Sequence, residues 1–114
     1  MGTTPKDKSP ELLPGTLDLL ILKILARGPL HGYGIARRLE TISEDVLQVG
    51  ESSLYPALQR LLLNGWVGAE WGISDNNRRA RYYRLTPAGR KQLAIERDEF
   101  HRLIGAIQRV LENA

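Results

Sequence analysis

This chain of 114 residues has 42% hydrophobic and 25% charged residues, ordinary values for a single globular domain that can bury its own core. It has no cysteine, which excludes a disulfide scaffold, a thiol nucleophile and a cysteine-ligated zinc site, and which fits a reducing cytoplasm. The longest apolar run covers only residues 19–22, whereas a membrane span needs roughly 20 apolar residues, so no membrane insertion is expected. Residues 1–11 lack the apolar segment of a signal peptide, and we expect a flexible tail there.

The distribution of charge is more informative than the net charge of +3. Residues 73–85 hold four arginines and one aspartate, whereas residues 39–51 hold four acidic residues and no basic one. A basic patch confined to one segment of a weakly charged protein favours phosphate binding at that segment.

Two helices are predicted in the first half of the chain. The first follows Gly15 and ends at Gly28 and Pro29, and its apolar residues recur at helical spacing: Leu17, Leu20, Ile21, Ile24 and Leu25. The second opens at residues 31–34 and buries Ile35, Leu39 and Ile42. The two glycines in its first turn permit either close packing or a backbone turned towards a phosphate. Residues 47–49 could add a minor strand.

A third helix over residues 53–63 is followed at once by a predicted hairpin. Ser52 or Ser53 can cap the helix, and Asn64 with Gly65 ends it. The strands are expected at residues 66–71 and 81–85, with a polar loop at residues 72–80 that carries Arg78 and Arg79. A helix followed by a basic-tipped hairpin is what a winged helix-turn-helix uses to grip duplex DNA.

The last helix is predicted to run from Pro87 to about residue 112, with Thr86 as its N-cap. Its apolar stripe approaches a heptad seam, and we expect this seam to form a dimer interface: Leu93, Phe100, Leu103, Ile104, Ile107, Val110 and Leu111. The alternative is that the stripe folds back onto its own domain. Glu96 interrupts the seam, so we expect it at the interface edge or paired with an arginine.

The predicted fold class is mainly α with a small β-hairpin, a winged helix-turn-helix with the order α-α-α-β-β-α. Residues 12–86 would form the DNA-binding domain. Residues 87–114 would form the dimerisation helix, with help from the N-terminal segment.

Several short motifs together resemble the PadR family of bacterial winged-helix transcriptional regulators. They are GTLDLLIL at 15–22, HGYGI at 31–35, SLYPAL at 53–58, RL at 60–61, GW at 65–66 and RYYRLTPAG at 81–89. The resemblance implies a homodimeric repressor that binds a promoter operator, and the single C-terminal helix is similar to that of the short subgroup. It also suggests that Tyr33 touches a phosphate, although burial of Tyr33 against the third helix is an equal alternative.

The candidate DNA contacts are the polar residues of the third helix, the wing arginines and one tyrosine of the second helix: Tyr33, Ser52, Ser53, Tyr55, Gln59, Arg60, Arg78, Arg79 and Arg81. Hydroxyls bond phosphate oxygens or bases, glutamine can pair with adenine, and the arginine fork matches phosphate. The alternatives are structural: serine caps, a tyrosine in the core, and arginines that only keep a hairpin tip solvated. His31 is expected to cap or pack.

Two aromatic residues suggest a further site. Trp71 and Phe100 could line a pocket at the dimer interface for a flat small-molecule effector, as the resemblance to drug-sensing relatives implies, or could simply pack. No cofactor or metal is expected, because the two histidines lie in no metal-binding motif. An enzyme is not expected either, since no catalytic motif is present. A winged-helix module that binds protein is the other rival, but the polar surface of the third helix argues against it.

Overall fold

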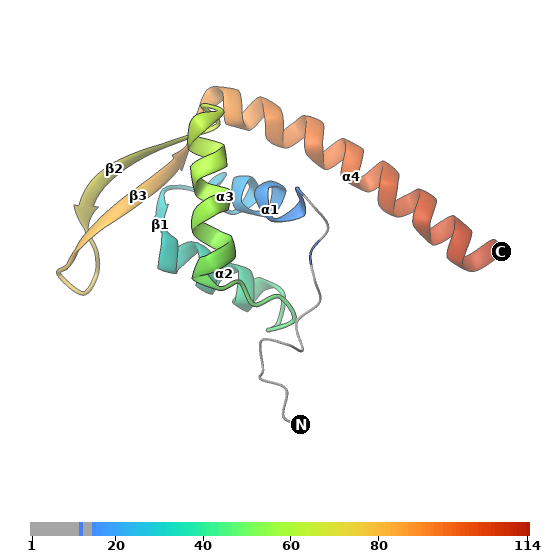
Figure 1. Cartoon of the computed structure of the whole chain (residues 1–114), viewed down its shortest axis with the longest axis horizontal. Coiled ribbons are helices and arrows are strands. Elements are labelled where there is room, and N and C mark those ends of the chain that lie inside the picture. Colours follow the sequence, from blue (N-terminus) through green and yellow to red (C-terminus); the bar gives the residue numbers. More distant parts are fainter. Residues whose placement is uncertain (1–11, 13–14) are drawn as a thin grey trace.

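The computed structural model describes residue 12 and residues 15–114, so the tail predicted at residues 1–11 lies outside the described residues (Figure 1). The elements follow the order α1 (Thr16–Leu25), β1 (Leu30–His31), α2 (Gly32–Ile42), α3 (Glu51–Leu63), β2 (Val67–Ile73), β3 (Arg79–Leu85) and α4 (Pro87–Asn113). Helices α1 to α3 form a bundle, the β2–β3 hairpin is the wing, and α4 extends away from both (Figure 1). This architecture confirms the predicted fold class and adds one short strand.

The core is centred on α1, which is enclosed by the other elements. Ile21 and Leu22 are fully buried, and they belong to one apolar cluster with Ile35 of α2 and Leu58 of α3. Burying one such side chain contributes about 1.5–3 kcal/mol to folding. Ile42, which we expected in this core, is exposed because α2 ends at that residue and the chain turns away.

The wing is longer and its loop shorter than predicted. The strands β2 and β3 pair antiparallel from Val67 and Leu85 out to Ile73 and Arg79. The turn at residues 74–78 is closed by a hydrogen bond from the Ser74 amide to the Arg78 carbonyl at 2.8 Å. Asn77 sits in the left-handed region with φ of 60°, which asparagine tolerates better than most residues. As a consequence, Arg79 lies in β3 and not in the loop.

Residues 47–49 do not form a strand, so the minor strand predicted there is wrong. The third strand of the sheet is β1, at residues 30–31. Leu30 pairs with Tyr83 and His31 pairs with Tyr82, so the sheet has the order β1-β3-β2. A strand of two residues is too short for an alternating pattern. Only its backbone pairing with β3 makes it a strand.

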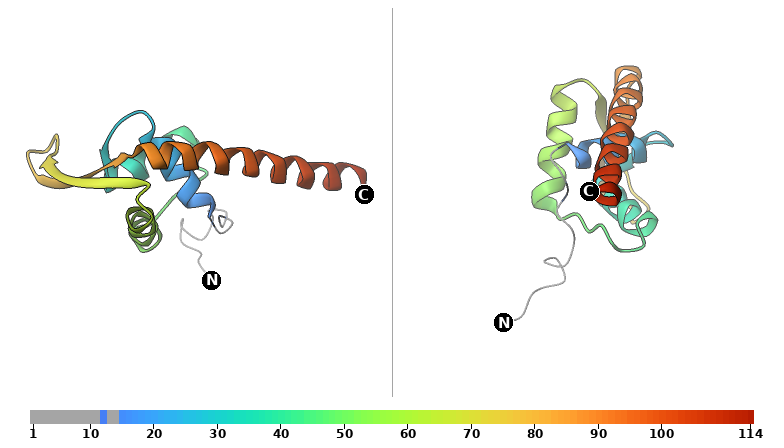
Figure 2. Two further views of the ribbon diagram at one scale, coloured as in Figure 1. Left: turned by 90° about the horizontal axis from the view of Figure 1, so that it is seen from above. Right: turned by 90° about the vertical axis from the view of Figure 1, so that its right-hand side faces the viewer.

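The start of α4 is locked against the base of the wing. Thr86 caps the helix as predicted, because its hydroxyl accepts from the Gly89 amide at 3.0 Å while donating to the Gly65 carbonyl at 2.7 Å. Gly89 lies against the backbone carbonyl of Trp66, where a Cβ atom has no room. Leu93 is buried in the core of its own chain, so its assignment to a dimer interface is wrong. Beyond this root, α4 projects well past the bundle (Figure 2).

Replacing Gly89 with alanine should therefore destabilise the fold. The added Cβ atom would collide with the Trp66 carbonyl, and overpacking of this kind costs about 1–3 kcal/mol. Chemical denaturation monitored by circular dichroism measures the change in the free energy of unfolding.

Gly105→Ala is the matched control, because Gly105 lies in the same helix and its Cβ would meet nothing closer than 3.6 Å. This substitution should leave stability unchanged or raise it by up to about 1 kcal/mol. Equal effects of the two substitutions would contradict the tight joint at Gly89.

Candidate nucleic-acid interface

Helix α3 buries one face and presents a polar face to solvent. Leu54, Leu58 and Leu61 are buried, whereas Ser52, Ser53, Pro56 and Gln59 are exposed. The expectation that a serine caps the helix is wrong: Gly50 is the N-cap, in extended conformation, and no side chain bonds the first turn. The helix begins two residues earlier than predicted, at Glu51. Both serine hydroxyls therefore lie on the outside of its first turn.

Tyr55 lies on the edge of α3 that faces α2. A Cβ atom built on Gly32 would lie 2.7 Å from the Tyr55 hydroxyl, so the first glycine of α2 is needed for close packing. Tyr55 is still 47% exposed. Partial burial, followed by the nearby Glu51 carboxylate, raises the pKa of the Tyr55 phenol. Its hydroxyl is therefore protonated, and it can donate to an anion at the surface.

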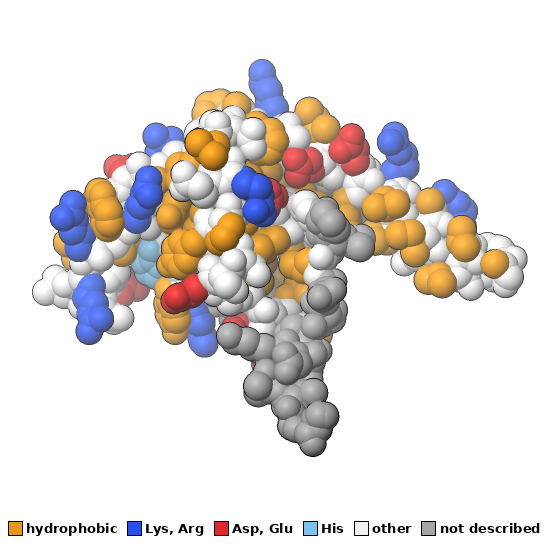
Figure 3. Space-filling view, viewed as in Figure 1, with side chains coloured by type: hydrophobic (Ala, Val, Ile, Leu, Met, Phe, Trp, Pro, Cys, Tyr) orange, Lys and Arg blue, Asp and Glu red, His pale blue; other side chains and the backbone are white. Residues whose placement is uncertain are grey.

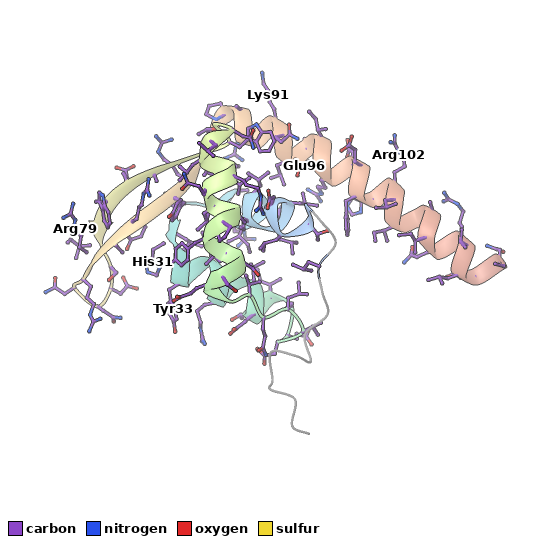
Figure 4. All side chains as sticks on the ribbon, viewed as in Figure 1. His31, Tyr33, Arg79, Lys91, Glu96 and Arg102 are labelled. Carbon is purple, nitrogen blue, oxygen red and sulfur yellow. The ribbon has the colours of Figure 1, made fainter. Side chains whose placement is uncertain are left out.

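His31 and Tyr33 lie beside the first turn of α2. His31 caps this helix, as expected, because its Nδ1 atom accepts from the Gly34 amide at 2.9 Å. Its ring also packs against Tyr82 of the wing, with the ring centres 5.3 Å apart. Tyr33 is 69% exposed, so the alternative of burial against α3 is wrong. Figure 4 shows His31 and Tyr33 between the lower part of α3 and the wing.

Arg60 is on the surface, but its charge is already engaged. Its Nη2 and Nε atoms donate to the two carboxylate oxygens of Asp18 at 2.7 and 3.2 Å. This hydrogen-bonded pair raises the pKa of Arg60 and ties α3 to α1. A guanidinium whose fork is filled by a carboxylate is poorly available to phosphate. The sequence did not reveal Asp18 as its partner, because the two residues are far apart in the chain.

The wing arginines have a different environment. Arg79 stacks on Trp71 with its guanidinium carbon 4.6 Å from the ring centre, and Arg81 lies 5.8 Å from the ring centre of Tyr83. Among the described residues, Arg78, Arg79 and Arg81 have no carboxylate within 4.0 Å, whereas Arg84 pairs with Glu70 at 3.6 Å. Figure 3 shows basic side chains gathered on the wing, on the same side of the molecule as α3.

Trp71 and Phe100 do not come together within the chain. Trp71 is exposed on the wing, whereas Phe100 packs from α4 against the core and borders a shallow depression between α1 and α4. Glu96, in the same depression, accepts a hydrogen bond from Gln92 at 2.7 Å and has no arginine within ion-pair distance in the described part of the chain. The expected pairing of Glu96 with an arginine is therefore wrong within this chain, whereas its place at the edge of a dimer interface stays a prediction.

Neither a metal centre nor a membrane-spanning helix is found in residues 12 and 15–114. In this region no three potential ligand side chains converge on a point where a metal could sit. None of the helices there combines the length and apolarity that crossing a bilayer requires.

The contact between Gly32 and Tyr55 can be tested through the ionisation of the phenol. Gly32→Ala should push the Tyr55 ring outwards into solvent, which removes part of the desolvation and lowers the pKa of Tyr55 towards its ordinary value. A spectrophotometric titration, with the same titration of Tyr55→Phe subtracted, isolates this group from the other tyrosines.

Gly34→Ala serves as the control, because its Cβ would lie 3.3 Å from the flexible Leu30 side chain and away from Tyr55. An unshifted titration in Gly32→Ala would contradict the close approach of the two helices.

The sequence and the fold both have relatives among transcriptional regulators. Residues 21–95 match the Transcriptional regulator PadR-like family. A transcriptional regulator of Mycobacterium tuberculosis is 37% identical over 79 residues, which cover 69% of this chain and 70% of the relative. A transcriptional regulator from Clostridium thermocellum, of known structure, has a TM-score of 0.76 and 29% identity, over 83% of this chain and 92% of that one.

A third relative has been solved as a complex. Bacillus subtilis PadR, whose structure was solved with operator DNA, has a TM-score of 0.61 and 26% identity, over 69% of this chain and 45% of that chain. Together these matches confirm the predicted family, the winged-helix fold and the general role of a DNA-binding transcription regulator that is not an enzyme. This chain belongs to the PadR-like family of transcriptional regulators.

Proposed function

We propose that this protein is a homodimeric repressor that binds an operator in duplex DNA and blocks the promoter. In this proposal the first turns of α3 enter the major groove, and the wing lies along the neighbouring backbone. The observation that carries the proposal is that the polar face of α3 and basic side chains of the wing lie on one side of the molecule (Figure 3).

Helix α3 supplies side chains suited to reading base edges. Ser52, Ser53 and Gln59 are exposed near or on its outward face, and none of them donates or accepts a side-chain hydrogen bond within the described residues. Gln59 can pair bidentately with adenine, and serine can bond either a base or a phosphate. Tyr55 and Tyr33 flank the helix and would donate their hydroxyls to phosphate oxygens. Arg60 is not among the main proposed DNA contacts, because Asp18 occupies its guanidinium.

The wing supplies most of the electrostatic attraction. Arg78, Arg79 and Arg81 carry charge that no neighbouring carboxylate in the described structure neutralises. A protein that neutralises phosphates in this way releases counterions, so its affinity falls as salt rises. The Bacillus subtilis relative was solved in complex with operator DNA, which supports duplex DNA as the partner.

The contribution of the wing can be measured as a salt slope. Replacing Arg78 and Arg79 by alanine should weaken binding to operator and random duplexes alike. It should also flatten the plot of log affinity against log salt by about 0.9 for each phosphate that the variant no longer neutralises. Fluorescence anisotropy with labelled duplexes at several salt concentrations measures both effects.

Arg84→Ala and Arg60→Ala are the controls, because each removes an arginine that a carboxylate already pairs. These variants should keep nearly the wild-type slope. If the paired arginines flattened the slope as much as the wing arginines do, the wing would have no special part in binding.

The proposal of a dimer rests on the C-terminal half of α4, which projects past the bundle (Figure 2). The helix has 27 residues, about 40 Å at about 1.5 Å per residue. Phe100 packs against the core, but beyond it Leu103, Ile107, Val110 and Leu111 form an exposed apolar stripe. Ile104, which we also assign to this interface, is half-buried. A stripe with spacings of three and four residues buries itself best against a second helix.

A twofold dimer through α4 would place two copies of α3 on the same side of a duplex. Regulators of this kind read half-sites about 34 Å apart, one turn of the double helix, so we expect a pseudo-palindromic operator. Occupation of such a site within a promoter would exclude polymerase sterically, which is the proposed route to repression.

Charging the stripe should separate the two protomers. Leu103→Asp with Ile107→Asp places carboxylates in the proposed interface, where unpaired charges are strongly unfavourable. Multi-angle light scattering should report a monomer, with little operator affinity and an unchanged unfolding transition of the winged-helix domain.

Arg102→Asp is the matched control, because the helical neighbours of Arg102 three and four positions away all lie outside the apolar stripe, and this variant should remain dimeric. A dimeric double variant would show that the chains assemble by another surface.

A further inference from the structure

We infer that Trp71 is itself a DNA-contacting residue, which forms with Arg79 one composite aromatic and cationic contact to the sugar–phosphate backbone. This inference rests on the proposed function and assigns Trp71 neither to a ligand pocket nor to the core. The surface is defined by four side chains, Trp71, Ile73, Arg79 and Arg81, and is called the wing face below.

The pairing of the strands places these side chains together. Trp71 lies opposite Arg81, and Ile73 lies opposite Arg79, so all four project from the same face of the hairpin. The same alternation continues inwards to Val67 and Tyr83, which are buried against the helices. The wing face is therefore the outward continuation of the side on which the wing meets the bundle. Figure 4 shows Arg79 well out along the wing.

The exposure of the wing face is unusual for its composition. Trp71 is 59% exposed and Ile73 is 66% exposed, although both are large and apolar. Neither residue packs on the core cluster, so burial within the domain does not account for them. Two arginines flank the indole, and no described carboxylate pairs with either. A partner that covers this surface must combine apolar and anionic groups at close spacing, as deoxyribose and phosphate do along a strand of DNA.

The stacked pair is prepared for phosphate binding. The guanidinium of Arg79 lies 4.6 Å from the Trp71 ring centre, which holds the arginine in one orientation. Stacking occupies one flat face of the guanidinium and leaves its N–H edge available for a bidentate contact to phosphate. An arginine that is already ordered loses less side-chain freedom when DNA binds.

The backbone beneath Trp71 is braced from the opposite face of the hairpin. The ring of Tyr82 fills the space over Gly72, where an added Cβ would lie 3.0 Å from it. The Tyr82 hydroxyl donates to the Ile73 carbonyl at 3.2 Å. The ring of His31 packs on Tyr82 in turn. The indole is therefore carried by a supported strand and not by a loose tip.

Tryptophan fluorescence tests the inference directly. The chain has two tryptophans, and Trp66 is half-buried at the root of the wing. Titrating the wild type with an unlabelled mixed-sequence duplex of about 30 base pairs, long enough for two half-sites, should quench and shift the emission. Trp71→Phe should still bind the duplex in a separate anisotropy assay, but its remaining emission should not respond. A response that persists in Trp71→Phe would overturn the inference.

Affinity measurements give a second, independent test. Trp71→Ala should bind the duplex about fivefold more weakly, the scale of ordering one long side chain on binding. Arg79→Lys keeps the charge but loses the planar fork, so it should also bind more weakly while keeping the wild-type salt slope. Arg84→Ala, on the opposite face of the same strand, should bind like the wild type. Wild-type affinity in Trp71→Ala would overturn the contact.

The outcomes separate this inference from the proposed function. If the wild type binds the duplex but neither Trp71 measurement responds, only the inference fails. If the wild type binds no duplex even at low salt, both fail. Polyglutamate is the remaining probe: should it change the emission of Trp71 as strongly as duplex does, the wing face would be a general anion surface and the DNA contact would be rejected.

Discussion

The joint between the end of α3, the base of the wing and the start of α4 determines how the functional parts of this regulator are arranged. The Thr86 hydroxyl bonds the Gly65 carbonyl, and the Thr86 amide bonds the Trp66 carbonyl at 3.1 Å. Gly89 lies directly against that same Trp66 carbonyl. The proposed recognition helix, α3, therefore meets the wing and the proposed dimerisation helix, α4, in one small, tightly packed region. Because this joint is tightly packed, it fixes the direction in which α4 leaves α3 and the wing.

The arginines illustrate how neighbours decide the role of a charge. Arg60 and Arg84 are both exposed, yet each faces a carboxylate, Asp18 in one case and Glu70 in the other. Arg79 instead rests on an indole, which orients the guanidinium without neutralising it. Surface ion pairs contribute little to stability, so the main effect of the pairs at Arg60 and Arg84 is to reduce positive charge away from the wing face. On the hairpin, the arginines without a carboxylate partner among the described residues are therefore Arg78, Arg79 and Arg81, which lie where DNA is proposed to bind.

The aromatic residues occupy different structural environments, although their side chains are chemically similar. Trp66 packs at the root of the wing, Phe100 closes the contact of α4 with the core, and Trp71 is exposed on the wing. Tyr55 fits over Gly32, so the Tyr55 ring keeps its position between α2 and α3 because residue 32 has no side chain. An aromatic effector pocket built from Trp71 and Phe100 would need a second chain to bring together residues that one chain keeps apart.

Local patterns in the sequence were sufficient for the helices, the hairpin and the family, because helical periodicity, the Thr86–Pro87 start and the glycine stops depend on near neighbours only. Strand alternation over residues 67–71 is likewise enough to place Trp71 on the same face as Val67. Tertiary structure alone decided the rest. The pairing of Arg60 with Asp18 joins residues 42 positions apart, β1 exists only through its partner β3, and Leu93 belongs to the core only because α4 is held against α1. These outcomes depend on contacts between segments that are distant in the sequence. Local sequence patterns do not predict which distant residues come into contact.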